Sequence, residues 1–202
     1  MTKTYNWAII GCGHIATKFA SDLKLLPNVK LYAAASRDLN RAQNFAKEYG
    51  FDVAYGSYEE LVNDPKVDAV YIATPHSFHR DHALLCLNHK KAVLCEKAFA
   101  MNKNEAEEMV ECAKENNTFL MEAFWTMFQP SFQKAMKIIE SGKLGKLKIL
   151  RSDFAFNAPF NEDKRLYNTK LGGGSLLDIG IYPVFAALTS LGVPEIIKTF
   201  AN

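Results

Sequence analysis

Short apolar runs alternate with longer segments in which apolar residues recur every three or four positions. The apolar runs are typical of strands buried on both faces of a parallel sheet, and the longer segments have the spacing of amphipathic helices. Strands and helices that alternate in this way predict a parallel sheet with right-handed crossovers and helices on both faces. The predicted strands are residues 7–10, 29–35, 69–73, 92–95 and 119–121, and the predicted helices are residues 15–26, 39–49, 58–62, 80–88 and 103–116.

Two of the predicted helices carry start signals. Asp38 directly precedes the second helix, where its carboxylate can accept a backbone N–H of the first turn. Ser57 and Glu60 have the spacing of a capping box at the start of the third helix. The capping signals and the apolar periodicity therefore predict the same α/β domain over residues 1–125.

The pattern changes after Trp125. Two strands and two helices leave apolar area uncovered, so residues 126–202 are predicted to be the incomplete beginning of an α+β domain. No low-complexity tract separates the two parts, and we expect them to pack closely. The elements predicted there are a helix over 130–141, a strand over 147–156, a polar loop over 157–170, an apolar helix over 175–191 and a strand over 196–200.

Composition narrows the class of protein. The 202 residues are 49% hydrophobic, and 24 basic residues scattered among 22 acidic ones give a net charge of +2, so nucleic acid is not an expected partner. No apolar run approaches the roughly 20 residues of a membrane helix, and the N-terminus lacks the features of a secretory leader. The four cysteines form no CxxC pair. We therefore expect a soluble, cytoplasmic protein with reduced thiols and no membrane partner.

The strongest local motif is GCGHIA at residues 11–16, between the first predicted strand and the first predicted helix. Gly11 permits a tight turn, Gly13 lets the backbone approach a diphosphate, and Ala16 allows close contact between helix and strand. This context predicts a Rossmann dinucleotide site that also includes Cys12, His14 and Ile15. A plain glycine-rich turn is the alternative.

The choice of cofactor depends on the end of the second strand, where NAD enzymes usually place an acid for the ribose 2′-hydroxyl. Here Ser36 and Arg37 occupy that position, and Arg41 follows one helical turn later. A guanidinium can bind a 2′-phosphate through two donors, so NADP is favoured over NAD. Two alternatives remain: Asp38 serves NAD, or the two arginines belong to a solvated helix start.

The chain resembles the family of glucose-fructose oxidoreductase, inositol dehydrogenase and MocA. The resemblance lies in GCGHIA, in CEKA at 95–98, where the family typically has Glu-Lys-Pro, and in GGGSLLDIGIY at 172–182, which occur in family order. MEAFWT at 121–126 resembles the branch of dimeric dihydrodiol dehydrogenase and NADP-linked D-xylose dehydrogenase. The family implies that the second domain begins an open-faced, mostly antiparallel sheet, truncated here, that supports a homo-oligomer when complete.

The resemblance also implies that Lys97 and Tyr182 converge over a nicotinamide. A tyrosine, with an ordinary pKa near 10, is a poor base unless a neighbouring ammonium favours its phenolate, and Lys97 would supply that charge. Asp178 lies one helical turn before Tyr182, where it would bind a substrate hydroxyl or position Lys97. Many relatives have histidine in place of this tyrosine. Without the resemblance, a solvated Asp178 and a packed Tyr182 would be the simpler interpretation.

Further cofactor contacts are expected in the loop after the fourth strand, because open α/β sheets bind ligands beyond the carboxyl ends of their strands. No metal site is expected, because no carboxylate or cysteine completes a set with His76, His79 and His82. Trp125 is interpreted either as an apolar wall for the nicotinamide or as a packed aromatic at the domain junction. The expected contacts are Thr74, Pro75, His76, His79, Glu96, Lys97 and Trp125.

These observations predict hydride transfer between NADP(H) and a hydroxyl or carbonyl carbon of a sugar or trans-dihydrodiol. An NAD-linked inositol-type dehydrogenase, a non-catalytic dinucleotide-binding sensor and a structural interaction module are the alternatives. Ala98 replaces the usual proline after Lys97. If relatives use a cis bond there, alanine bears about 2.5–4 kcal/mol for the same geometry.

Overall fold

The computed structural model describes residues 3–200 and divides the chain into two compact units. The first unit, called the nucleotide unit below, contains the described residues up to Ala123 together with Lys170–Gly172. The second unit contains Phe124–Thr169 and the described residues from Gly173 onward.

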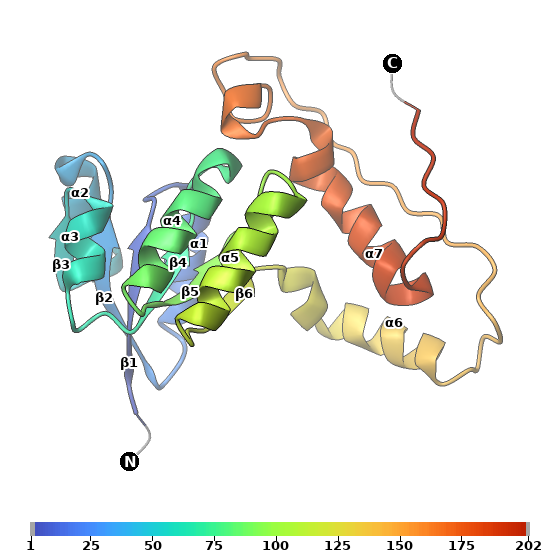
Figure 1. Ribbon diagram of the computed structural model, residues 1–202, viewed down its shortest axis with the longest axis horizontal. Helices are drawn as coiled ribbons and strands as arrows, with labels where there is room; N and C mark the ends of the chain where they lie inside the picture. The colour runs from blue at the N-terminus through green and yellow to red at the C-terminus, as the bar shows by residue number, and fades with distance from the viewer. Residues whose placement is uncertain (1–2, 201–202) are drawn as a thin grey trace. The chain divides into compact units, whose positions relative to one another are not determined.

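A six-stranded parallel sheet forms the centre of the nucleotide unit (Figure 1). The strand order is β3-β2-β1-β4-β5-β6, so the order reverses between β1 and β4, where such sheets place their ligands. The predicted α/β class is confirmed. The strands are β1 (Tyr5–Ile10), β2 (Val29–Ala35), β3 (Val53–Tyr55), β4 (Ala69–Ile72), β5 (Ala92–Cys95) and β6 (Leu120–Glu122).

Helices cover both faces of this sheet, because successive residues of a buried strand point to opposite sides. Ile10 of β1 packs in a core beneath α3, α4 and α5, whereas its neighbour Ile9 packs in a second core beneath α1 and α2. Both isoleucines are completely buried. The helices are α1 (His14–Leu23), α2 (Leu39–Tyr49), α3 (Tyr58–Asn63), α4 (His79–Asn88) and α5 (Lys103–Glu115), with a short 3₁₀ helix, η1 (His76–Phe78).

The predicted helix caps are present. The Asp38 carboxylate accepts the backbone N–H of Arg41, and the Ser57 hydroxyl accepts that of Glu60. Asn102 caps α5 in the same way through the N–H of Glu105. Each cap satisfies a donor of the first turn, which fixes where the helix begins.

The second unit is helical and irregular within its described residues. The predicted strands over 147–156 and 196–200 are wrong, because neither segment pairs with another strand. Ile149, Ile196 and Ile197 are each more than 70% exposed, so the apolar side chains behind those predictions are uncovered. The sheet expected for this domain is therefore not formed here. The elements of this unit are η2 (Trp125–Phe128), α6 (Pro130–Glu140), the π-helical turn η4 (Leu176–Gly180) and α7 (Ile181–Leu191). The 3₁₀ turn η3 (Thr169–Leu171) lies at the boundary, since Lys170 and Leu171 belong to the nucleotide unit.

One helical stretch of the described chain, Thr169–Leu191, is long and apolar enough to cross a membrane by length and composition alone. The prediction that no apolar stretch approaches this length is therefore wrong. That prediction considered only uninterrupted apolar runs, whereas a helix that contains a few polar residues can also be apolar enough on average to cross a membrane. The core helix of a soluble protein passes the same test, so the stretch is weak evidence for a membrane.

Candidate dinucleotide-binding site

Gly11 and Gly13 shape the turn between β1 and α1 in different ways. Gly11 has a φ of +92°, and a Cβ built on it would lie 2.9 Å from the carbonyl oxygen of Ala73. A Cβ built on Gly13 would meet no atom within 4 Å. A side chain at Gly11 would clash with the backbone at Ala73, so glycine is required there. Gly13 instead leaves open space in front of the helix.

The first turn of α1 is suited to an anion. Gly13 is its N-cap, no side chain caps it, and its first turn has no acidic residue. The N-terminal N–H groups and the helix dipole therefore favour negative charge at this position. Ala16 is completely buried against the sheet, while His14 and Ile15 are exposed beside the turn. The turn has the geometry that diphosphate binding requires.

Cys12 has a structural place in this loop. Its side chain is buried, and its Sγ lies 3.6 Å from the carbonyl oxygen of Ala35 at the end of β2. Burial raises the pKa of the Cys12 thiol to about 11, so the group stays protonated at neutral pH. The backbone of this residue, rather than its thiol, faces the next element of the site.

Arg41 of α2 is bound to the glycine loop. Its Nε and Nη2 donate to the carbonyl oxygen of Cys12 at 3.1 Å and 2.9 Å. The sequence placed this guanidinium at a 2′-phosphate; the structure shows it holding the loop that follows β1. Two hydrogen bonds from one planar group fix both the position and the orientation of that carbonyl.

The end of β2 presents Arg37 rather than an acid. Asp38 uses its carboxylate as the cap of α2, and its own N–H lies 3.3 Å from the buried Ser36 hydroxyl. Arg37 is exposed, and its guanidinium carbon lies 5.5 Å from the centre of the Phe78 ring. A flat cation therefore stands at the position that distinguishes the two dinucleotides.

His79 is an internal support in this structure. Its side chain is completely buried, and its Nδ1 and Nε2 each lie 2.8 Å from a backbone carbonyl oxygen, those of Ala98 and Thr74. Burial lowers the pKa of the ring to about 4, against the smaller opposite effect of the two carbonyls. Thr74 and Pro75 precede η1, and the Nδ1 of buried His76 lies 3.0 Å from the carbonyl oxygen of Gly172. His79 thus joins two loops rather than presenting a surface to a ligand.

The loop that carries Lys97 is held at several backbone atoms. The Lys97 N–H donates to Glu96 Oε2 at 3.1 Å, and the Phe99 N–H donates to Glu122 Oε1 at 3.0 Å. The Tyr71 hydroxyl donates to the other oxygen of Glu96. The peptide bond between Lys97 and Ala98 is cis. Glu96 therefore supports the loop beside Lys97.

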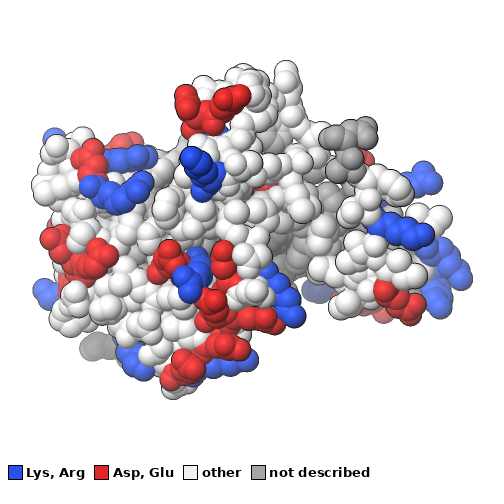
Figure 2. All heavy atoms as spheres, turned by 45° about the horizontal axis from the view of Figure 1, so that its top comes forward, with Lys and Arg blue, Asp and Glu red and all other residues white. Residues whose placement is uncertain are grey.

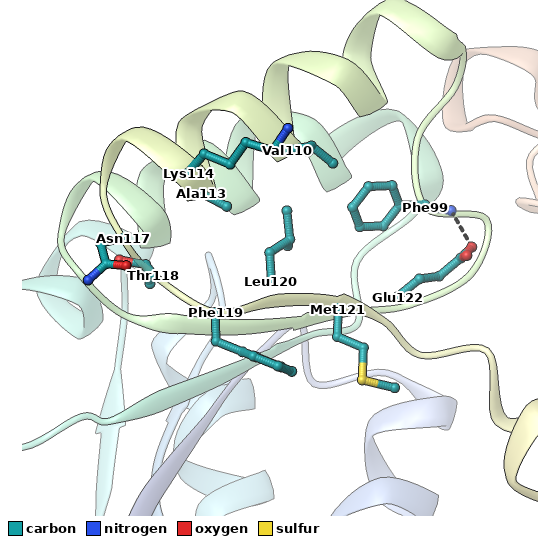
Figure 3. Close-up of a pocket in the computed structure, with 10 residues that line it drawn as sticks. All are labelled: Phe99, Val110, Ala113, Lys114, Asn117, Thr118, Phe119, Leu120, Met121 and Glu122. Atoms are coloured by element: carbon teal, nitrogen blue, oxygen red, sulfur yellow. Dashed lines mark hydrogen bonds between the residues drawn. The ribbon is translucent and has the colours of Figure 1, made fainter.

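The Glu122 carboxylate also lines a cavity of about 610 Å³ between α5 and the edge strand β6 (Figure 3). Burial raises the pKa of this carboxyl, and the hydrogen bond from Phe99 opposes that rise. Phe119 and Val110 are exposed on the same cavity. No residue of the glycine loop lines it, so the cavity is separate from the dinucleotide site.

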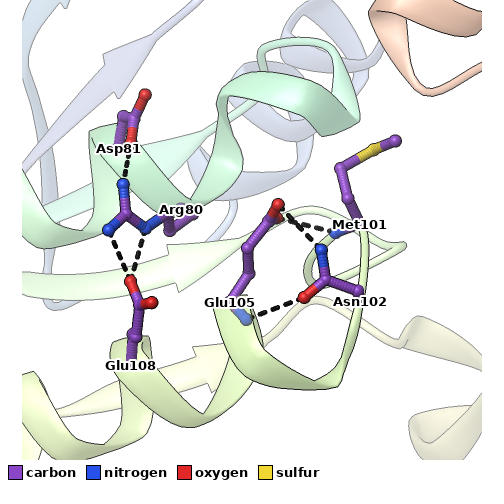
Figure 4. Close-up of polar contacts among 6 residues, drawn as sticks. All are labelled: Arg80, Asp81, Met101, Asn102, Glu105 and Glu108. Atoms are coloured by element: carbon purple, nitrogen blue, oxygen red, sulfur yellow. Dashed lines mark hydrogen bonds and ion pairs between the residues drawn. The ribbon is translucent and has the colours of Figure 1, made fainter.

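Charged side chains on α4 and α5 stabilise the packing of these two helices (Figure 4). Arg80 donates to Asp81 at 2.8 Å through Nη1 and to Glu108 at 2.6 Å through Nε. The contact with Glu108 joins the two helices at an exposed position, and the contact with Asp81 lies within α4. Among the described residues, no group of His, Cys, Asp and Glu side chains is arranged to hold a metal ion.

Three of the predicted site residues belong to the second unit. Asp178 is buried in η4, and its carboxylate accepts from Arg165 Nη2 at 2.8 Å. The ring of Tyr182 packs on those of Phe124 and Phe154. Trp125 is 53% exposed in η2. Arg165 was missed by the sequence analysis, because it lies in a polar loop with no local motif that connects it to an acid 13 residues later.

A parallel sheet of this order, with a glycine turn opening a helix at the reversal point, defines a dinucleotide-binding Rossmann domain. Residues 5–124 match the family model described as "Oxidoreductase family, NAD-binding Rossmann fold", and residues 132–202 match the GFO/IDH/MocA C-terminal domain. The chain belongs to the GFO/IDH/MocA oxidoreductase family. The resemblance found in the sequence is confirmed.

Several curated relatives share one name. The trans-1,2-dihydrobenzene-1,2-diol dehydrogenases of Xenopus laevis and Mus musculus are 42% and 43% identical to this chain over 180 residues. Each match covers 88% of this chain and 54% of the relative. The chain thus spans about half the length of the curated relatives it matches.

Solved structures agree on the fold. A 3-ketoreductase from Actinomadura kijaniata, solved with NADP and TDP-benzene, has a TM-score of 0.84 and 29% identity, covering 94% of this chain and 58% of the other. The myo-inositol 2-dehydrogenase of Lactobacillus plantarum has a TM-score of 0.66 and 30% identity, covering 71% and 43%.

Proposed function

We propose that the nucleotide unit binds NADP(H), with the diphosphate at the first turn of α1 and the 2′-phosphate at Arg37. The open space at Gly13 carries the proposal, because a bound diphosphate needs backbone N–H groups that no side chain covers. Asp38, the alternative residue for NAD, is engaged as the cap of α2. The ketoreductase neighbour solved with NADP supports the same preference.

For the whole protein, we propose hydride transfer between NADP(H) and a hydroxyl or carbonyl carbon of a trans-dihydrodiol or a sugar. The names of the curated relatives support the diol, and the myo-inositol 2-dehydrogenase neighbour supports a polyhydroxylated substrate. Bound NADP(H) would supply the hydride acceptor or donor. The residues of this chain would bind the substrate, orient it and move the proton.

The proton chemistry is assigned to three side chains. Tyr182 would take the hydroxyl proton during oxidation and return it during reduction, and the positive charge of Lys97 would favour its phenolate. Asp178 would orient the substrate hydroxyl, with Arg165 fixing its carboxylate in place. Glu96 and Glu122 would support Lys97 through its loop.

We also propose a cytoplasmic enzyme with a small-molecule substrate, which forms a homo-oligomer if the full second domain is present. All four cysteines are free and buried, which supports a reducing compartment. Figure 2 shows Lys and Arg side chains interleaved with Asp and Glu over the face drawn. On that face, a polyanion would meet no continuous basic surface among the described residues.

The test separates binding from turnover. NADPH binding is measured by fluorescence titration, and turnover of trans-dihydrodiols and aldoses by absorbance of the reduced nicotinamide. Lys97→Met and Tyr182→Phe should each lower turnover by about 100-fold or more while NADPH still binds. Lys103→Met, which removes an exposed lysine paired with Glu107, is the matched control. Wild-type turnover in both site variants would reject the assignment, and binding without turnover in the wild type would favour the sensor alternative.

A further inference from the structure

Flat side chains are layered at the end of β2, behind Arg37. The guanidinium carbon of Arg37 lies 5.5 Å from the centre of the Phe78 ring. Phe78 also stacks on the His82 ring, with 5.8 Å between centroids and 16° between planes. Tyr58 contacts the edge of His82 at 4.6 Å and 75°. The layers therefore support Phe78 from the interior of the unit.

The innermost rings of this stack are anchored. The Nδ1 of His82 lies 3.0 Å from the hydroxyl of Thr74, which belongs to the loop after β4. Tyr58 is buried at the start of α3. Burial and the charge of Arg37 together lower the pKa of His82 to about 4, against the opposing charges of Asp81 and Glu59. His82 is accordingly neutral at pH 7, so its ring adds no positive charge beside Arg37 and the half-buried Phe78 ring.

An arginine that must bind a phosphate loses side-chain freedom when the ligand arrives. The face of an aromatic ring attracts a guanidinium and holds it flat, so part of that loss occurs before binding. A 2′-phosphate gains from a guanidinium that already presents its donors, whereas a bare ribose hydroxyl gains much less. The effect of the ring should therefore appear in the difference between the two dinucleotides.

We propose that Phe78 is a specificity-determining residue, whose ring positions the Arg37 guanidinium and thereby raises affinity for a 2′-phosphorylated adenine nucleotide over its unphosphorylated counterpart. The inference rests on the proposed function, since it assigns a second residue to the same 2′-phosphate site. The alternative is a purely structural role, in which Phe78 covers His82 and Tyr58 and affects only the stability of the fold.

Nucleotide fragments test this without turnover. The dissociation constants of 2′,5′-ADP and 5′-AMP are measured by calorimetry at fixed ionic strength on the full chain. Phe78→Leu should weaken 2′,5′-ADP by about two- to fivefold and leave 5′-AMP unchanged. Phe78→Trp, which keeps an aromatic face, should retain the wild-type ratio. Phe119→Leu, at an exposed phenylalanine outside the site, is the matched control.

A double-mutant cycle adds a sharper criterion. In an Arg37→Gln background, Phe78→Leu should have no further effect on the ratio of the two constants. If the wild type prefers 2′,5′-ADP but Phe78→Leu weakens both fragments equally or neither, the role of Phe78 is rejected and the proposed function stands. A loss of the preference in Phe78→Trp also rejects it, even if Phe78→Leu does not fold. A wild type that binds neither fragment rejects the proposed function and this inference together.

Discussion

Arg37 and Arg41 lie one helical turn apart but have different surroundings. Arg41 donates twice to the Cys12 carbonyl, whereas Arg37 is exposed over an aromatic ring. We expect Arg41→Ala to weaken NADPH and NADH by a similar factor, about tenfold, because it releases the loop that binds the diphosphate common to both. Arg37→Asp should weaken NADPH selectively. Titration of each variant with both cofactors checks this, and a loss confined to NADPH in Arg41→Ala would contradict the structural role.

His79 and His82 link stability to pH. Burial lowers the pKa of each ring to about 4, below the ordinary value of 6.5. Between these values the unfolded chain binds protons that the folded chain does not, so stability should fall as the pH drops from about 6.5 to 4. The slope is at most about 1.4 kcal/mol per pH unit for His79, which is completely buried.

Urea unfolding at pH 7, 6 and 5 measures this dependence. A His82→Asn variant should show a shallower loss than the wild type, and replacement of the exposed His89 by Asn should leave the slope unchanged. Equal slopes in wild type and His82→Asn would show that His82 does not carry the lowered pKa.

Some of these residues could be predicted from the sequence and others could not. Gly11 and Asp38 follow local rules, since a turn or a cap involves residues only a few positions away. Phe78 and Arg165 act on partners from other elements, Arg37 and Asp178, and no short motif encodes such pairs. The sequence placed Arg41 at the cofactor but missed its Cys12 partner, which lies 29 residues earlier.

The turn between β1 and α1 offers a matched pair of variants. Gly11→Ala should destabilise the fold by about 1–3 kcal/mol, because its φ is positive and its Cβ would approach the Ala73 carbonyl. Gly13→Ala meets no protein atom, so it should leave stability near wild type. Its methyl group would instead occupy space assigned to the diphosphate and weaken NADPH about tenfold or more.

Urea unfolding and NADPH titration on both variants distinguish these effects. The assignment predicts that stability is lost mainly at Gly11 and binding mainly at Gly13. Unchanged NADPH affinity in Gly13→Ala would remove the diphosphate from this turn.

Strands were predicted correctly where they are buried on both faces of the sheet. The prediction failed where the presence of a partner strand decides whether a segment forms a strand. Central strands such as β1 and β4 are continuous apolar runs, which the pattern detects. β3 was missed, because its three residues, Val53–Tyr55, lie at the sheet edge and are too short to show a period. Residues 147–156 have strand-like composition, but a strand exists only beside another strand, and composition does not supply one.

At the scale of the whole molecule, a ligand that binds only the folded nucleotide unit must stabilise that unit. At 100 times its dissociation constant, NADPH should add about 2.7 kcal/mol to the stability of that unit and raise its melting temperature. NADH at the same concentration should add less, and Arg37→Asp should reverse the order. Calorimetric melting of the full chain with each cofactor measures this.

Hydrogen exchange locates where that stabilisation acts. NADPH should slow exchange at the first turn of α1, which directly follows the glycine loop, and in η1, which contains Phe78 beside Arg37. Helix α6 belongs to the other unit and should keep its exchange rate in the presence of NADPH if the cofactor contacts only the nucleotide unit. Equal thermal shifts with both cofactors would contradict the 2′-phosphate assignment. Unchanged exchange in α1 would contradict the diphosphate site, whatever the thermal shift, because binding must protect the amides that it contacts.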